Sequence, residues 1–276
     1  MTVENLLFFA KGHIHSDHAK ILIAELLNCN PLELLNHLND EVSSEKVELL
    51  KKEIKALEEN KPLQYVLGHI NFYGNDFYID ERVLIPRFET EELVENTIKY
   101  INEFFTNPVD IIDLGTGSGV IGLTLEKKVS TNSVDLIDIS KDALEVTNIN
   151  CGKLNSKANI IESDMFSAVN KKYDVIISNP PYIDPEEPIE DKVEKYEPAL
   201  ALYADHHGLS CYEEILEKVS YYMKKDSVLA FEIGYLQKDP LISIAKQNLN
   251  DREISVEQDM SGRDRFLIVT PKKKQL

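Results

Sequence analysis

Residues 1–70 carry apolar side chains at the three- and four-residue spacing of amphipathic helices. Polar residues of the types that cap helix N-termini precede these segments. We predict one helix capped by Ser16 or Asp17, a second that opens at the Asn30-Pro31 pair and a third capped by Ser44. The buried faces of the first and third helices would hold Leu22, Ile23, Leu26, Leu27, Val47, Leu50, Ile54 and Leu57. This part of the chain is therefore predicted to form a small helical bundle.

An alternating stretch follows the helical part and is predicted to form a β-hairpin over Phe72–Ile79, with its turn at Gly74-Asn75. We assign residues 71–86 to a linker that contains this hairpin. The next helix is expected to begin with Thr90 as its cap, since the two glutamates that follow suit a first helical turn. It runs to about Phe105, and its inward face would hold Val94, Ile98, Ile101 and Phe105.

From Val109 onward, short strand patterns alternate with helical patterns. The predicted strands are Val109–Leu114, Ser133–Asp138, Asn159–Glu162, Tyr173–Ser178, Val228–Ile233, Glu253–Gln258 and Arg265–Thr270. Such alternation produces a mainly parallel sheet with helices on both faces. We therefore predict an α/β fold over residues 87–276, with a seven-stranded doubly wound sheet that ends in a hairpin.

Composition and charge exclude several classes of protein. The chain has 276 residues, 43% of them hydrophobic and 28% charged, which is typical of a globular domain. No apolar run approaches the roughly 20 residues of a membrane span, and no secretory signal is expected. The cysteines, Cys29, Cys151 and Cys211, are scattered, which favours a cytoplasmic location. The net charge of −18 argues against DNA or RNA tracking and favours a small-molecule or protein substrate.

A metal site is not expected. His13, His15 and His18 are close in sequence, but their spacing does not require them to meet on one helix face. No cysteine pair has the spacing of a zinc site.

A glycine-rich loop follows the first strand of the predicted sheet. It comprises Asp113, Leu114, Gly115, Thr116, Gly117, Ser118 and Gly119. Glycines let a backbone approach a ligand closely at the start of a helix. The spacing of Gly117, Gly119 and Gly122 also fits G-x-G-x-x-G, which leaves a dinucleotide-binding reading open. Asp138, at the end of the second strand, would bind ribose hydroxyls in either case.

Acidic residues end three successive strands. We expect the Asp113 carboxylate to lie at the mouth of the glycine loop, where it would repel a pyrophosphate and favour a cationic ligand such as S-adenosylmethionine. Asp164, after the third strand, can accept a hydrogen bond from an adenine amino group, and Met165 would lie against the ring. The alternative is that Asp113 and Asp164 are helix caps and that Met165 fills the core. The three acidic residues at successive strand ends, Asp113, Asp138 and Asp164, indicate a cofactor site more specifically together than any one of them does alone.

The segment Ser178-Asn179-Pro180-Pro181-Tyr182 follows a buried strand, where the active-site loops of open α/β sheets lie. The two prolines remove backbone donors but keep their carbonyl acceptors. A planar –NH2 group would fit between the Asn179 side-chain oxygen and the Pro180 carbonyl, with Tyr182 stacked on it. The alternative is a proline turn that only ends the strand.

These residues together resemble a class I S-adenosylmethionine methyltransferase of the amino-methylating type. A longer pattern is similar to the HemK-type protein-(glutamine-N5) methyltransferases. It adds Pro62-Leu63-Gln64-Tyr65, Gly68, Val83-Leu84-Ile85-Pro86-Arg87, Thr90-Glu91 and Ser163-Asp164-x-Phe166. Phe88 and Met165 depart from the pattern, because the family usually has proline and an aromatic residue there. Because Met165 replaces an aromatic residue, its contacts with the adenine ring would differ from those in the family.

The resemblance implies methylation of the glutamine in the Gly-Gly-Gln motif of peptide chain release factors, with S-adenosylhomocysteine as the second product. It also implies a helical N-terminal domain that helps to hold the protein substrate. Catalysis would then rest on Asn179, Pro180 and Tyr182, and substrate binding on these and Pro181. The cofactor-binding set would comprise Asp113, Gly115, Thr116, Gly117, Ser118, Gly119, Asp138, Asp164, Met165 and Asn179.

Five other functions remain open at this point. An rRNA-base methyltransferase is disfavoured by the acidic net charge. A glutamine methyltransferase of a ribosomal protein would carry the same motifs. A DNA adenine-N6 methyltransferase would use the same Asn-Pro-Pro-Tyr motif to bind the amino group of a flipped base, but the acidic net charge disfavours this function. Asp113 and the Asn-Pro-Pro-Tyr segment argue against an NAD-dependent oxidoreductase. The complete cofactor set argues against a binding module without activity.

Overall fold

The computed structural model describes residues 1–272, so the last four residues of the predicted 87–276 domain lie outside it. The chain forms two compact units. One contains Met1–His69 together with Glu190–Tyr196, and the other contains Ile70–Ile189 and Glu197–Leu276.

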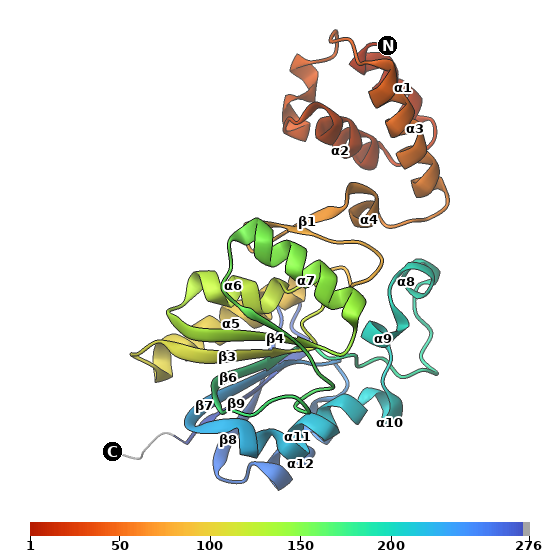
Figure 1. Ribbon diagram of the computed structural model, residues 1–276. Coiled ribbons are helices and arrows are strands. Elements are labelled where there is room, and N and C mark those ends of the chain that lie inside the picture. The colour runs from red at the N-terminus through yellow and green to blue at the C-terminus, as the bar shows by residue number, and fades with distance from the viewer. Residues whose placement is uncertain (273–276) are drawn as a thin grey trace. The chain divides into compact units, whose positions relative to one another are not determined.

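The first unit is helical (Figure 1). Its elements are α1 (Val3–Lys11), α2 (Ser16–Leu27), the 3-10 helix η1 (Pro31–Asn36), α3 (Ser44–Glu58), α4 (Leu63–Leu67) and α8 (Asp191–Tyr196). Leu22, Ile23, Leu50 and Ile54 are buried in its core, as their spacing predicts. The short helix α8 comes from far along the chain, and the Tyr196 hydroxyl donates to the carbonyl of Glu59 at 2.7 Å.

Two of the predicted caps in this unit are wrong by one residue. The Nδ1 atom of His15 accepts from the backbone N–H of Asp17, so His15 caps α2 instead of Ser16 or Asp17. Ser43 caps α3 instead of Ser44. Asn30 does cap the next segment, in a capping box with Glu33, but that segment is a 3-10 helix. Ser43 and Ser44 have the same capping ability, and in both helices the backbone geometry decides which residue lies just outside the first turn.

The second unit is built on a seven-stranded sheet with the order β5-β4-β3-β6-β7-β9-β8. The strands are β3 (Val109–Leu114), β4 (Thr131–Asp138), β5 (Asn159–Glu162), β6 (Tyr173–Ser178), β7 (Met223–Glu232), β8 (Arg252–Gln258) and β9 (Asp264–Pro271). Strands β3 to β7 are parallel, and β9 pairs antiparallel with β7 and with β8. The predicted α/β class, strand number and terminal hairpin are confirmed.

Helices cover both faces of this sheet (Figure 1). On one side lie α5 (Phe88–Phe104), α6 (Val120–Lys128) and α7 (Lys141–Leu154). On the other lie α11 (Ser210–Tyr222) and α12 (Lys238–Asn248). Each face of the sheet packs against its helices in a separate hydrophobic core. Alternate residues of β3 belong to the two cores, since Ile111 packs with the first set of helices and Ile112 with the second. Two short helices, α9 (Ala199–Leu202) and α10 (Asp205–Gly208), follow the loop after β6.

The hairpin of β1 (His69–Phe72) and β2 (Asn75–Tyr78) turns one residue earlier than predicted. Its two turn residues, Tyr73 and Gly74, have φ angles of 50° and 77°. Positive φ at both positions gives the type of tight turn whose twist matches that of paired strands. Phe72 and Phe77 are buried in the core of the second unit, and Tyr78 exchanges two hydrogen bonds with the Asn150 side chain of α7.

Thr90 does not cap α5, contrary to the prediction, because the helix begins at Phe88. Thr90 is buried in the first turn, and its hydroxyl donates to the carboxylate of Glu232 at 2.7 Å. An N-cap residue lies outside the helix, so the earlier start of α5 makes this side chain available for a tertiary contact.

Candidate active site

The candidate site lies where the strand order reverses. From β3 the chain first adds β4 and β5 on one side, and it then crosses to β6 on the other. Ligands of open α/β sheets bind at such switch points, beyond the carboxyl ends of the strands. Leu114 and Ser178 are paired as the last residues of β3 and β6, and Ser178 Oγ donates to the Leu114 carbonyl at 2.6 Å. The glycine loop and the Asn-Pro-Pro-Tyr segment therefore leave the sheet side by side.

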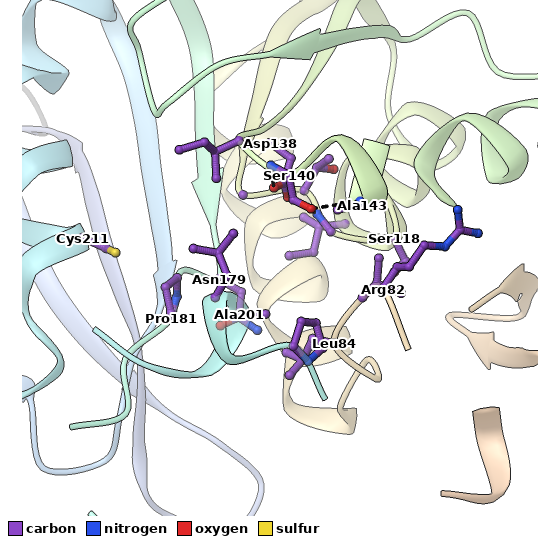
Figure 2. Close-up of a pocket in the computed structure, with 18 of the residues that line it drawn as sticks. Arg82, Leu84, Ser118, Asp138, Ser140, Ala143, Asn179, Pro181, Ala201 and Cys211 are labelled. Atoms are coloured by element: carbon purple, nitrogen blue, oxygen red, sulfur yellow. Dashed lines mark hydrogen bonds between the residues drawn. The ribbon is translucent and has the colours of Figure 1, made fainter. Parts of the chain in front are cut away.

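A cavity of about 240 Å³ opens at this point. Its walls combine backbone of the glycine loop, the three carboxylates of Asp138, Asp164 and Glu214, and apolar side chains. They include Gly115, Thr116, Gly117, Ser118, Asp138, Ile139, Ala143, Asp164, Met165, Asn179, Pro181 and Ala201. Figure 2 shows Asp138 and Ser140 above Asn179 and Pro181. Of the predicted site residues, Asp113, Gly119, Pro180 and Tyr182 are not in the cavity wall defined by residues 1–272.

Asp113 lies beneath the glycine loop, which differs from its expected position at the loop mouth. Its Oδ2 atom accepts from the Thr116 hydroxyl at 2.6 Å and from the Gly122 backbone N–H at 3.1 Å. The side chain is fully buried, and burial raises the pKa of this carboxyl to about 6. Asp113 therefore holds the shape of the loop through Oδ2, while its buried Oδ1 atom has no hydrogen-bond partner within residues 1–272.

Asp138 lies in the cavity wall and is held by two backbone donors. Its Oδ2 atom accepts from Gly117 N and its Oδ1 atom from Ser140 N, both at 2.9 Å. Each oxygen keeps a second lone pair, and the residue lies in the cavity wall. Burial raises the pKa of this carboxyl, while the backbone donors oppose that shift. The two backbone bonds therefore orient an acceptor toward the cavity.

A hydrogen-bonded chain links Asn179 to the interior. Asn179 Nδ2 donates to Thr90 Oγ1 at 3.3 Å, and the Thr90 hydroxyl donates to Glu232 Oε2 at 2.7 Å. The Tyr182 hydroxyl lies 3.5 Å from Glu232 Oε1. Sequence reasoning placed Asn179 and Tyr182 in the site but did not assign Thr90 or Glu232 to it. The sequence signals were the position of Glu232 at a strand end and the presence of Thr90 in the family pattern.

A side-chain amide fixes the turn of the Asn-Pro-Pro-Tyr segment. Gln237 Nε2 donates to the Tyr182 carbonyl at 3.0 Å and approaches the His207 and Gly208 carbonyls at 3.3 Å. Its Oε1 atom accepts from Gly234 N at 2.9 Å. The loop after β6 is thereby tied to the loop after β7 and to α10.

A partly buried ion pair supports one wall of the cavity. The Glu197 carboxylate accepts from Arg87 Nη2 at 2.6 Å and from Ile85 N at 3.1 Å. Its side chain is only 2% exposed, whereas that of Arg87 is 37% exposed. The next residue, Pro198, lies in the cavity wall. The ion pair thus joins the segment before α5 to the segment that enters α9.

We expect Arg87→Ala to lower the free energy of unfolding by about 1–3 kcal/mol, because it leaves the buried Glu197 carboxylate without its cation. Urea denaturation at neutral pH measures this change. The control is Lys218→Ala, which removes an exposed pair with Glu214 and should change the free energy by less than about 1 kcal/mol. Equal losses in the two variants would contradict the role of the Arg87–Glu197 pair.

Comparisons with known proteins identify the family. The model of the methyltransferase small domain matches residues 90–195, and that of the PrmC N-terminal domain matches residues 10–68. A release factor glutamine methyltransferase of Lactococcus lactis is 36% identical over 242 residues, which cover 87% of this chain and 88% of that protein. The chain belongs to the release factor glutamine methyltransferase family. The relative in Bacillus subtilis is 34% identical over 85% of this chain and 84% of its own length.

Solved structures agree with this fold. A ribosomal protein L11 methylase from Lactobacillus delbrueckii has a TM-score of 0.53 at 19% identity and covers 71% of this chain and 84% of its own. The 16S rRNA N2 G1207 methyltransferase of Thermus thermophilus also has a TM-score of 0.53, at 14% identity, over 74% of this chain and 50% of its own. Family membership confirms that the protein is a methyltransferase and excludes the alternative that its glycine loop binds a dinucleotide.

Within residues 1–272, no helix is long and apolar enough to cross a bilayer.

Proposed function

We propose that this protein transfers a methyl group from S-adenosylmethionine to the side-chain amide nitrogen of the glutamine in the Gly-Gly-Gln motif of peptide chain release factors. The observation that carries the proposal is the pairing of the glycine loop with an Asn-Pro-Pro-Tyr segment in a member of this family. The helical N-terminal unit, which includes the PrmC N-terminal domain, helps to hold the protein substrate.

The cavity walls fit the cofactor. Carboxylates suit its hydroxyl, amino and ammonium groups, and the cavity contains Asp138 and Asp164. Ile139 and Met165 offer apolar surface to an adenine ring. Arg82 is the one basic side chain in this wall as defined by the described residues, so little positive charge opposes a sulfonium. When bound, S-adenosylmethionine supplies a methyl group made electrophilic by its positively charged sulfur.

A carboxamide nitrogen is a poor nucleophile, because its lone pair is delocalised into the carbonyl. Asn179 Oδ1 and the Pro180 carbonyl compensate by accepting its two hydrogens and orienting it. Neither oxygen accepts a hydrogen bond from any residue between 1 and 272, so both are available. Orientation of this kind can lower a barrier by several kcal/mol. The two acceptors also stabilise the positive charge that develops on the nitrogen. As the N–C bond forms, the S–C bond breaks and S-adenosylhomocysteine leaves, and the nitrogen loses one proton after the transfer.

Tyr182 fixes the plane of the amide. Its hydroxyl points toward Glu232, and its ring packs beside the core beneath α11. Burial and the negative charge of Glu232 raise the pKa of this phenol, so it stays neutral and does not serve as a base. Its contribution is therefore a rigid flat surface.

The first test measures transfer of a labelled methyl group to purified release factor. Parallel acceptors are a release factor with its motif glutamine changed to alanine, a ribosomal protein and duplex DNA. We expect label on the release factor and its loss with the glutamine change. Label on the ribosomal protein or the DNA alone would overturn the proposed substrate and keep the methyltransferase assignment.

Asp138→Asn tests the cofactor assignment. Loss of one or two charge-assisted hydrogen bonds should raise the dissociation constant for S-adenosylmethionine by about 10–100-fold. Isothermal titration calorimetry measures it directly. The matched control is Asp142→Asn, an exposed aspartate in the first turn of α7. Unchanged affinity in a folded Asp138→Asn protein would remove Asp138 from the site.

A further inference from the structure

A buried carboxylate ends strand β7. Glu232 is 2% exposed, and its two oxygens face different residues of the site. Oε2 accepts from the Thr90 hydroxyl, and Oε1 faces the Tyr182 hydroxyl. Its backbone carbonyl accepts from Tyr212 at 2.7 Å, which fixes the strand end against α11. The Glu232 carboxylate thus contacts Thr90, which is bonded to Asn179, and also faces Tyr182 of the Asn-Pro-Pro-Tyr segment.

The nearest cation does not neutralise Glu232 through a hydrogen bond. Arg265 donates from Nε to Asp259 at 3.3 Å and from Nη1 to the Ile233 carbonyl at 3.1 Å. Arg265 is thereby held by other acceptors and acts on Glu232 through its field alone. The Thr90 hydroxyl is therefore the main hydrogen-bond donor to this carboxylate within residues 1–272.

The direction of the chain follows from what each group can do. An ionised carboxylate only accepts, so the single hydroxyl proton of Thr90 must point to Glu232. Thr90 Oγ1 can then only accept from Asn179, which requires the Asn179 –NH2 group to face Thr90. The Asn179 oxygen is left facing the other way. An amide turned by 180° would place two acceptors in contact.

We propose that Thr90 and Glu232 are positioning residues that lock the Asn179 side chain with its oxygen toward the substrate amide. The inference rests on the proposed role of Asn179 as an acceptor. It also gives a reason why the site selects an –NH2 donor, because a locked oxygen accepts a hydrogen and cannot offer one.

The lock depends on the charge of Glu232. The groups that face it are Arg265 from β9, Glu89 from α5, Tyr182 from the loop after β6 and Tyr212 from α11, with Asp259 paired to Arg265. Burial is the largest effect and raises the pKa of Glu232 to about 7. A protonated Glu232 can donate to Thr90, which frees the Thr90 proton for the Asn179 oxygen. The amide would then present its –NH2 group, and transfer should slow as the pH falls.

The experiment compares Thr90→Val with Thr97→Val in single-turnover transfer to release factor at saturating cofactor. Both threonines are buried in α5, but the Thr97 hydroxyl donates only to the Leu93 carbonyl of its own helix. We expect Thr90→Val to lower the rate by about 10–100-fold and Thr97→Val to change it by less than about threefold. Thr90→Ser should recover most of the rate. Cofactor affinity, measured by calorimetry, should stay within about threefold for all three variants.

The pH dependence of the transfer rate separates a positioning role of Glu232 from a merely structural one, because a merely structural role would not change the pH profile. The wild-type rate should fall as the pH decreases through about 7. Glu232→Gln cannot titrate, so this acid limb should disappear whichever way its amide lies. An acid limb that persists unchanged in Glu232→Gln would overturn the proposal.

Asn179→Ala, assayed in parallel, separates the two hypotheses. If Asn179→Ala is inactive while Thr90→Val matches wild type, the positioning role is wrong and the acceptor role of Asn179 stands. If Asn179→Ala retains wild-type activity, the acceptor role itself is wrong, and the positioning role falls with it.

Discussion

Asn179→Ala is expected to lower the single-turnover rate of methyl transfer by about 10²–10³-fold, the range seen when one hydrogen-bonding group that stabilises a transition state is removed. The variant removes the acceptor that orients the substrate nitrogen. It also frees the Thr90 hydroxyl from its second partner, but it leaves Thr90 bonded to Glu232. The fold should therefore persist.

Rapid-quench measurement with labelled cofactor and purified release factor gives this rate. Affinity for S-adenosylmethionine should change by less than about threefold, because Asp138, Asp164 and the glycine loop remain in place. Asn132→Ala is the control. It removes an exposed asparagine near the start of β4, whose amide donates to the Pro108 carbonyl. Turnover at the wild-type level in Asn179→Ala would show that the assigned role is wrong.

Gly208→Ala is expected to reduce transfer by at least about 100-fold, since a displacement of roughly 1 Å in a reacting group is enough for a loss of this size. A Cβ atom at residue 208 would lie 2.0 Å from the Tyr182 carbonyl oxygen and 2.7 Å from Gln237 Nε2. The oxygen belongs to the backbone, so the Asn-Pro-Pro-Tyr segment must shift. The φ angle of 78° adds strain to the substitution.

Gly262→Ala separates displacement from backbone strain. Gly262 has a φ angle of 77°, but its added Cβ would have no neighbour within 4 Å. Both variants should lose about 1–2 kcal/mol of stability from the left-handed backbone. Only Gly208→Ala should lose activity. Matching kcat values in the two variants would contradict the displacement of Tyr182.

Several elements could be predicted because their signals are local. The strands Val109–Leu114, Asn159–Glu162 and Tyr173–Ser178 were predicted with the bounds that the structure shows. A short, apolar, β-branched run indicates a buried strand without knowledge of its neighbours. The turn glycines Gly115, Gly117 and Gly119 all have positive φ, which their residue type favours.

Other predictions were wrong because tertiary contacts compete with local preferences. Thr90 looks like a cap in sequence, but α5 begins two residues earlier and buries it against Glu232. Asp113 was expected at the mouth of the glycine loop, and it instead lies beneath the loop, bonded to Thr116 and Gly122. In both cases the side chain satisfies a buried partner that the sequence cannot locate.

The sequence by itself determined the fold class, the family and the two segments that form the candidate site, because these depend on periodicity and on short motifs. Only the tertiary structure decided how Asn179 is oriented. Its partner Thr90 lies 89 positions away, and Thr90 lies 142 positions from Glu232. Contacts over such separations are set by the order of strands in the sheet and by the burial of a carboxylate that needs a donor.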